Sequence, residues 1–199
     1  MEDIGLFRGY NYFMKKKLRK EEFRLGQIHG RLQAKDKHSE AQIQRVVFLS
    51  QKIRLWRTMH EQADIRLFGY EVPLKTGCHR GECVDIIGYD KDCNLYIFEL
   101  KQKKYSKNTI EIKNQILSYA NAVRTIKKSL EEAFEKEFHL PIEFRDIKSV
   151  LLAPKEFYKD KDLTQYKNYG IECAYFRDSK IQKRKPGDTY ITHVSLVKT

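Results

Sequence analysis

Two neighbouring apolar segments near the middle of the chain show the pattern of a β-hairpin. Residues 83–89 and 95–101 are rich in apolar side chains, and the polar residues 90–94 connect them. Asp and Asn, which favour turns, dominate the connection. Because side chains on a strand alternate between its faces, Glu99 and Lys101 share one face. Each predicted strand therefore carries one carboxylate, Asp85 or Glu99, among residues that favour burial.

The register of this hairpin follows from centring its turn on Asp92. Residue numbers of paired positions then sum to 184, which puts Asp85 opposite Glu99. Like charges at directly opposed positions are destabilising, and burying a carboxylate is costly without compensation. A divalent cation such as Mg²⁺ or Mn²⁺ would offset both costs, because hard cations take oxygen ligands. The alternative is an ordinary salt bridge between Glu99 and Lys101 on a solvated face.

Other periodic patterns predict the remaining elements. Ser39 is the expected N-cap of a helix of about 20 residues. Apolar residues at a period near 3.6 predict a long helix over 109–137. Together with the hairpin, these give the order α-β-β-β-α-β-α-β and an α/β fold, a mixed central sheet flanked by helices on both faces. Shorter runs predict the rest: strands over 65–74, 149–153, 171–176 and 189–197, and a short helix over 155–168.

The first part of the chain differs from the rest in charge. Residues 1–38 hold ten Lys and Arg against five acidic residues, and Lys15, Lys16 and Lys17 are consecutive. We interpret this segment as a basic N-terminal helical arm that contacts phosphates, followed by one domain over 39–199. A solvated helix that packs its aromatic residues on the domain is the open alternative.

Composition narrows the class of partner. Lys and Arg number 39 against 27 acidic residues, a net charge of +12, which favours nucleic acid, most simply DNA. The alternative is a solvated basic surface that serves solubility. Four cysteines in 199 residues indicate reduced thiols and a cytoplasmic location rather than a disulfide scaffold. We expect neither a signal peptide nor a membrane span, because no apolar run is long enough.

The placement of acidic and basic residues resembles the PD-(D/E)XK nuclease superfamily, which includes type II restriction enzymes, Holliday-junction resolvases and recombination exonucleases. The resemblance covers about residues 39–177 and implies a restriction-endonuclease-like core. Val84 stands where the motif's name has Pro. The matching residues are Glu40 on the first helix, Asp85 on the second strand, Glu99-Leu100-Lys101 on the third, and Gln115 with Tyr119 on the next helix, a pair similar to the Q-x-x-x-Y element of the recombination-exonuclease branch.

The resemblance implies a Mg²⁺-dependent (or Mn²⁺-dependent) deoxyribonuclease, either an endonuclease or an exonuclease. Asp85, Glu99 and the backbone carbonyl of Leu100 would bind the metal. Glu40 would reach the metal or its water, and Lys101 would position that water and stabilise the transition state. Homodimers are common among endonucleases of this type, because each active site cuts one strand.

Gln115 and Tyr119 would orient Lys101 or a substrate phosphate, although Tyr119 also fits a place in the core. The first-turn position of Glu40 is also favoured by the helix dipole alone. Two other functions stay open: a non-catalytic nuclease-fold subunit that binds nucleic acid in a larger complex, and a pure interaction domain.

Further candidates lie around the hairpin. Lys103, Lys104 and Lys107 follow the catalytic strand, where they would meet a phosphate backbone, or else form a solvated loop. Arg80 precedes the first strand of the hairpin and is a candidate for DNA contact. Cys78, His79, Cys83 and Cys93 have the chemistry of zinc ligands, but their spacing matches no paired C-x-x-C motif, so core or loop cysteines are favoured.

Overall fold

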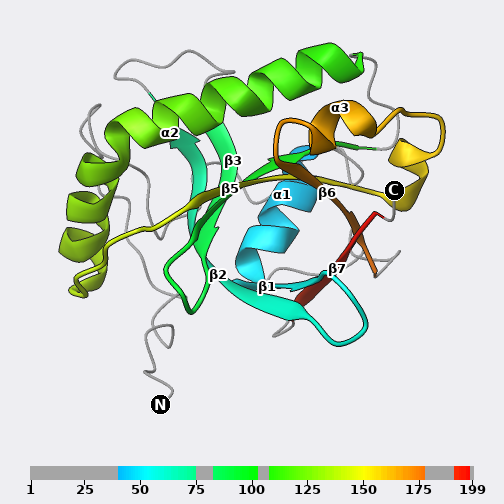
Figure 1. The fold of residues 1–199 in the computed structure, drawn as a ribbon. Coiled ribbons are helices and arrows are strands. Elements are labelled where there is room, and N and C mark those ends of the chain that lie inside the picture. The colour runs from blue at the N-terminus through cyan, green and yellow to red at the C-terminus, as the bar shows by residue number, and fades with distance from the viewer. Residues whose placement is uncertain (1–39, 75–82, 103–107, 178–190, 198–199) are drawn as a thin grey trace.

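Seven strands form a closed barrel in the computed structural model of the protein, which describes residues 40–74, 83–102, 108–177 and 191–197 (Figure 1). One helix, α1 (Glu40–Leu49), lies within the ring of strands, and α2 (Thr109–Phe138) and α3 (Thr164–Lys167) lie outside it. The strands are β1 (Lys52–Trp56), β2 (Gln62–Pro73), β3 (Cys83–Tyr89), β4 (Leu95–Leu100), β5 (Ile147–Ala153), β6 (Ile171–Phe176) and β7 (Thr192–Leu196).

Strand pairing runs without a break around the ring. β1 to β4 pair as antiparallel neighbours, β4, β5 and β6 are parallel, and β7 pairs antiparallel to β6. A parallel pairing of β7 with β1 closes the barrel. The expectation of an open mixed sheet flanked by helices is therefore wrong. The strands that the structure describes form a closed ring without an open edge, and one helix occupies the space that the sheet encloses.

The error originates in β1, which the sequence pattern placed inside a first helix of about 20 residues. That helix instead ends at Leu49, and Gln51 takes a left-handed conformation with a φ of 60°. Ser50 turns the chain here, because its buried hydroxyl donates to the carbonyl oxygen of Val47 at 2.6 Å. The hydroxyl of Thr192 donates to that of Ser50 at 2.8 Å, which ties the end of α1 to the start of β7.

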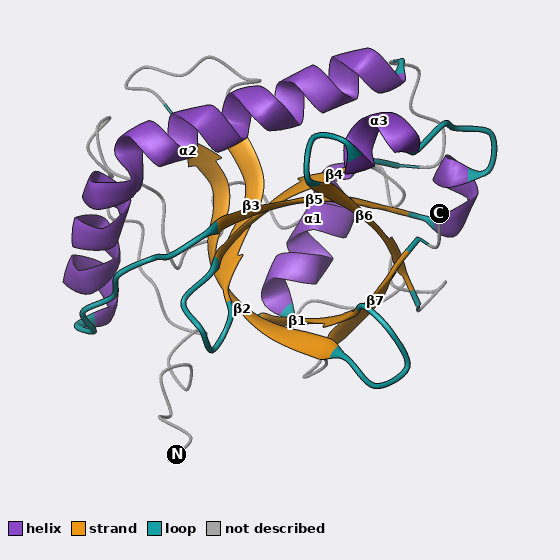
Figure 2. Ribbon diagram, in the orientation of Figure 1, coloured by secondary structure: helices purple, strands orange, loops and turns teal. Residues whose placement is uncertain are grey.

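The interior of the barrel is an apolar core built around α1. Ile43, Val46, Val47 and Phe48 of α1 pack against inward side chains from all seven strands. Figure 2 shows the helix surrounded by strands, with the other helices on the outside. A helix with one strongly apolar side buries it best where strands enclose it. This packing orients α1 and hence its first residue, Glu40.

The outer face of β2 to β5 is covered mainly by α2, and α3 packs on β6. The first turn of α2 is capped by the side chain of Asn108, which accepts a hydrogen bond from the backbone N–H of Glu111 at 2.8 Å. The helix matches the range expected from its periodicity. The predicted single helix over 155–168 is divided into a short 3₁₀ turn (Lys155–Tyr158) and α3. None of the helices in the described ranges is long and apolar enough to cross a membrane.

The predicted hairpin register is confirmed. β3 and β4 pair Ile86 with Phe98 and Ile87 with Ile97, and both pairs of numbers sum to 184. The alternation of faces is also confirmed, because Phe98 lies in the interior core and Ile97 lies in the cluster beneath α2. By the same alternation Glu99 is on the outer face, toward α2.

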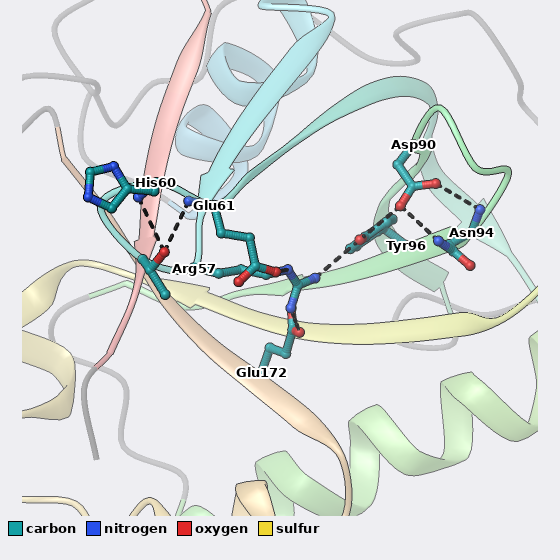
Figure 3. Close-up of polar contacts among 8 residues, drawn as sticks. Arg57, His60, Glu61, Asp90, Asn94, Tyr96 and Glu172 are labelled. Atoms are coloured by element: carbon teal, nitrogen blue, oxygen red, sulfur yellow. Dashed lines mark hydrogen bonds and ion pairs between the residues drawn. The ribbon is translucent and has the colours of Figure 1, made fainter.

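A polar network joins strands at the end of the barrel where β4 begins (Figure 3). Arg57 forms an ion pair with Glu172 of β6, and it donates to the hydroxyl of Tyr96 at 3.2 Å. That hydroxyl donates to Asp90 at 3.1 Å, and Asp90 also accepts from the backbone and side-chain amides of Asn94. The network fixes the β3–β4 turn against the core.

Asp90→Asn should destabilise the protein by about 1–3 kcal/mol at neutral pH, because hydrogen bonds to a buried carboxylate are lost. Burial opposes ionisation of Asp90, but hydrogen bonds from Asn94, Asp92 and Tyr96 outweigh it and lower its pKa. Ionised Asp90 therefore stabilises the fold above the ordinary carboxyl pKa, and this contribution disappears as the pH falls through the lowered pKa.

Urea denaturation of the wild type and the variant at several pH values measures this effect. The difference in unfolding free energy should narrow as the pH falls below about 4. Asp160→Asn, at an exposed carboxylate, is the matched control and should change stability little at any pH. A difference in unfolding free energy that stayed constant with pH would contradict the stabilising role of ionised Asp90.

Candidate active site

Lys101 is the centre of the cluster that the sequence singled out. It follows β4 directly, and its side chain is only 2% exposed. Its ammonium forms an ion pair with Glu99, whose side chain is 3% exposed, and lies 3.7 Å from a carboxylate oxygen of Glu40. A buried ammonium is costly unless carboxylates compensate it, and here two of them do. Residues from α1 and β4, far apart in sequence, therefore meet at one cation.

Burial alone would lower the pKa of Lys101, but the neighbouring carboxylates act in the opposite direction. The charges of Glu99 and Glu40, the hydrogen bond to Glu99 and the charge of Asp85 outweigh burial and raise the pKa. Lys101 is consequently a cation at neutral pH. It can supply fixed positive charge, but it is unsuited to give up a proton.

Asp85 lies on β3 beside this pair. Its Oδ2 accepts a hydrogen bond from the backbone N–H of Leu100 at 2.7 Å, so β4 holds the carboxylate in place. Burial and the charge of Glu99 raise its pKa well above the usual range, against the lowering effects of the Leu100 hydrogen bond and Lys101. Asp85 and Glu99 therefore repel one another, as the opposed register predicts.

Gln115 and Tyr119 of α2 border the same cluster. The Gln115 side-chain amide donates to the Tyr119 hydroxyl at 2.8 Å, one helical turn away. Burial raises the pKa of Tyr119 to about 12, the Gln115 hydrogen bond opposes this, and the charges of Glu99 and Asp85 add to it. The Tyr119 hydroxyl is thus near both carboxylates and stays protonated at neutral pH. The six candidate residues Glu40, Asp85, Glu99, Lys101, Gln115 and Tyr119 come together from four elements.

The charge and donor chemistry of this cluster fit a divalent metal ion. Glu40, Asp85 and Glu99 carry three potential negative charges against one ammonium, a formal excess of two. Carboxylates, with the Leu100 carbonyl, are the hard oxygen donors that Mg²⁺ and Mn²⁺ prefer. Within the described ranges, no three His, Cys, Asp or Glu side chains lie close enough to hold a metal by themselves. Two carboxylates would therefore need backbone or water oxygens to complete the shell.

The Gln115 amide oxygen offers a further donor. It is buried and makes no hydrogen bond to any residue that the structure describes. A buried amide oxygen without a partner is uncommon in native proteins and often marks a place for water or an ion. Its position one turn from Tyr119 puts this acceptor at the border of the carboxylate cluster.

Other candidates from the sequence lie outside the described residues. These are Lys15, Lys16 and Lys17 of the predicted basic arm, then Cys78, His79 and Arg80, and Lys103, Lys104 and Lys107.

The two described cysteines of the zinc hypothesis are far apart. Cys83 begins β3 and Cys93 lies in the turn after it, so a strand of seven residues, about 23 Å long, separates them. They cannot share one metal ion. Their placement agrees with the favoured interpretation as core or loop residues.

A second polar feature has no counterpart among the patterns of the sequence. Four basic residues, Arg124, Lys127, Arg145 and Lys148, line a cleft between α2 and the start of β5. Arg124 and Lys127 are on α2, Arg145 is in the loop before β5, and Lys148 is on β5; a basic residue at such positions is common. No spacing pattern connects them, so only the tertiary structure shows that they face the same space.

Comparisons with known proteins leave the family open. The structure is similar to the crystal structure of a repair endonuclease from Pyrococcus abyssi, with 19% sequence identity and a TM-score of 0.31. The matched region covers 55% of this chain and 37% of that chain. No protein-family model matches the sequence, and no curated protein matches it. This similarity shows neither a family nor a function for this chain.

Lys101→Met should lower stability by about 3–5 kcal/mol, because the change removes the cation that compensates buried Glu99. The double variant Lys101→Met/Glu99→Gln should recover most of this loss, since it also removes the buried negative charge. Chemical denaturation of the wild type, both single variants and the double variant gives the coupling energy. Strictly additive effects would show that the two groups do not depend on one another.

Proposed function

We propose that this protein is a metal-dependent nuclease that hydrolyses phosphodiester bonds of DNA with Mg²⁺ or Mn²⁺. One observation carries the proposal: buried Lys101 is held between Glu99 and Glu40, and Asp85 is fixed beside them by β4. Buried charges with strongly shifted pKa values cluster at functional sites more often than elsewhere. A fold that needed only stability would gain from apolar residues at these positions.

Each residue has a role that its surroundings support. Asp85, Glu99 and the Leu100 carbonyl would hold the metal, with Glu40 at the edge of the cluster. The bound metal would polarise the scissile phosphate and make its water more acidic. Lys101 would orient that water and stabilise negative charge as it develops on the phosphate oxygens, since its raised pKa keeps it positive.

Gln115 and Tyr119 would position the reacting groups from the α2 side. A tyrosine with a pKa of about 12 remains protonated and can donate a hydrogen bond to a phosphate oxygen or to water. The Gln115 amide holds that hydroxyl at 2.8 Å. Both residues lie on one long helix that packs against the barrel, and this packing holds them in place relative to β4.

The proposal covers both endonuclease and exonuclease action, and a homodimer would allow cutting of both strands. The net charge of +12 supports a nucleic-acid substrate, because it favours association with phosphate backbones. Cys93 and Cys173 carry free thiols, which is in keeping with a cytoplasmic protein.

Asp85→Asn tests the proposal directly, because it keeps the acceptor for the Leu100 N–H but removes the charge. Purified wild-type protein should cleave plasmid or linear DNA with Mg²⁺ or Mn²⁺, and the variant should be at least about 100-fold slower. Titration calorimetry should show Mn²⁺ binding to the wild type and not to the variant. Asp92→Asn, in the exposed turn of the same hairpin, is the matched control and should retain wild-type cleavage and binding.

Equal cleavage by wild type and Asp85→Asn would refute the assignment of this site. The second candidate function is a nucleic-acid-binding protein of nuclease-like design that does not cut. The lack of three close ligand side chains in the described ranges favours it. Salt-dependent DNA binding without Mn²⁺ binding or cleavage would establish this second function instead.

A further inference from the structure

A basic cleft lies on the outside of the barrel, between the middle of α2 and the start of β5. Its volume is about 490 Å³, and it is lined by Arg124, Lys127, Arg145, Asp146, Ile147 and Lys148. None of these residues has a role in the catalytic cluster. Four cations around one cleft need an explanation, because like charges that share a site repel one another.

The two walls of the cleft are held in fixed positions. On the loop side, the Arg145 N–H donates to the carbonyl of Cys93 at 2.9 Å, and the Asp146 carbonyl accepts from Leu95 at 2.8 Å. Phe144 is buried in the cluster beneath α2, and its N–H donates to Glu131 of α2 at 2.7 Å. Hydrogen bonds on both sides therefore attach this segment to the hairpin and to the helix.

The excess positive charge of the cleft resides on its two arginines. Lys127 pairs with Glu131 at 3.3 Å, and Lys148 pairs with Asp146 at 3.7 Å. Arg124 contacts only the neutral side chain of Asn121, at 2.7 Å, among the interactions of the described residues. Guanidinium groups bind phosphate through two parallel hydrogen bonds, which makes arginine well suited to backbone recognition.

The cleft and the catalytic cluster are the same distance apart when measured along two elements, the β4–β5 pair and α2. On the sheet, Glu99 pairs with Leu151 and Leu95 with Ile147, so four residues of β5, about 13 Å, separate the two places. On α2, Gln115 and Arg124 are nine positions apart, which is also about 13 Å along the helix axis. Each strand of duplex DNA carries a phosphate every 3.4 Å or so along the axis, so this distance corresponds to about four phosphates.

We infer that this cleft binds the backbone of the same nucleic acid about four nucleotides from the phosphate at Lys101, with Arg124 and Arg145 as the phosphate contacts. The spacing of four nucleotides rests on the proposed function, because it is counted from the phosphate at Lys101. Binding at the cleft does not itself require cleavage. The occupant is a phosphate row rather than a base edge, because the cleft offers positive charge on an open surface. Such contacts position a substrate without selecting its sequence.

The double variant Arg124→Gln/Arg145→Gln tests the inference by fluorescence anisotropy with a labelled 20-base-pair duplex, without divalent cation. Affinity should fall by about 10-fold or more, and the slope of log affinity against log salt should decrease in magnitude by nearly two. The matched control Lys128→Gln/Lys159→Gln removes the same charge at exposed positions that do not line the cleft. Melting temperatures should be unchanged in both, because all four side chains are exposed.

The inference is overturned if the cleft variant and the control lose affinity and salt dependence equally, or if the wild type binds no duplex. It is upheld if only the cleft variant loses both. Cleavage assays with Mg²⁺ separate this outcome from the proposed function. If the cleft variant loses DNA binding but neither it nor the wild type cleaves DNA, the proposed nuclease function is refuted and the cleft inference stands. If cleavage is normal and DNA binding does not depend on the cleft, the cleft inference is refuted and the nuclease function stands.

Discussion

Enclosure of α1 by the seven strands is the constraint on which the rest of the structure depends. The apolar side chains of this helix share one buried cluster with inward residues from every strand, and the sheet closes around it. That closure determines where α1 lies. Its first residue, Glu40, arrives 3.7 Å from the ammonium of Lys101, at the far end of β4. Packing in the interior thus places the Glu40 carboxylate in a cluster whose other members lie on or beside the outer face of the barrel.

The cluster itself is a local exception to the packing rules that built the barrel. An apolar core favours apolar side chains, yet Glu99 and Lys101 are almost fully buried. Glu99 and Lys101 compensate one another, whereas burial and the charge of Glu99 raise the pKa of Asp85 and so disfavour its ionised form. Charge excess held in place by rigid elements is a common basis of metal and phosphate binding. The same helix that supplies Gln115 continues to the basic cleft, so one element connects both polar features.

Local patterns predicted the hairpin, its register and the long helix well. Period-two alternation and a turn centred on Asp92 depend on neighbours in the sequence, and the pairing of Ile86 with Phe98 agrees with them. The first helix was predicted too long, because Lys52–Trp56 continues an apolar pattern that either structure could use. Its alternating burial as β1 depends on β2 and β7, which lie far away in the sequence. Without β1 the predicted strands cannot close into a ring, so the sequence patterns indicate an open sheet.

By itself, the sequence determined which residues carry the candidate chemistry, because carboxylates and a lysine within apolar strands are improbable without a compensating partner. The register that opposes Asp85 to Glu99 followed from the turn. Only the tertiary structure decided that the sheet closes, that Glu40 shares Lys101 with Glu99, and that Arg124 and Arg145 face one cleft. These juxtapositions join segments tens of residues apart, and the packing of complete elements, rather than any local pattern, sets their distances.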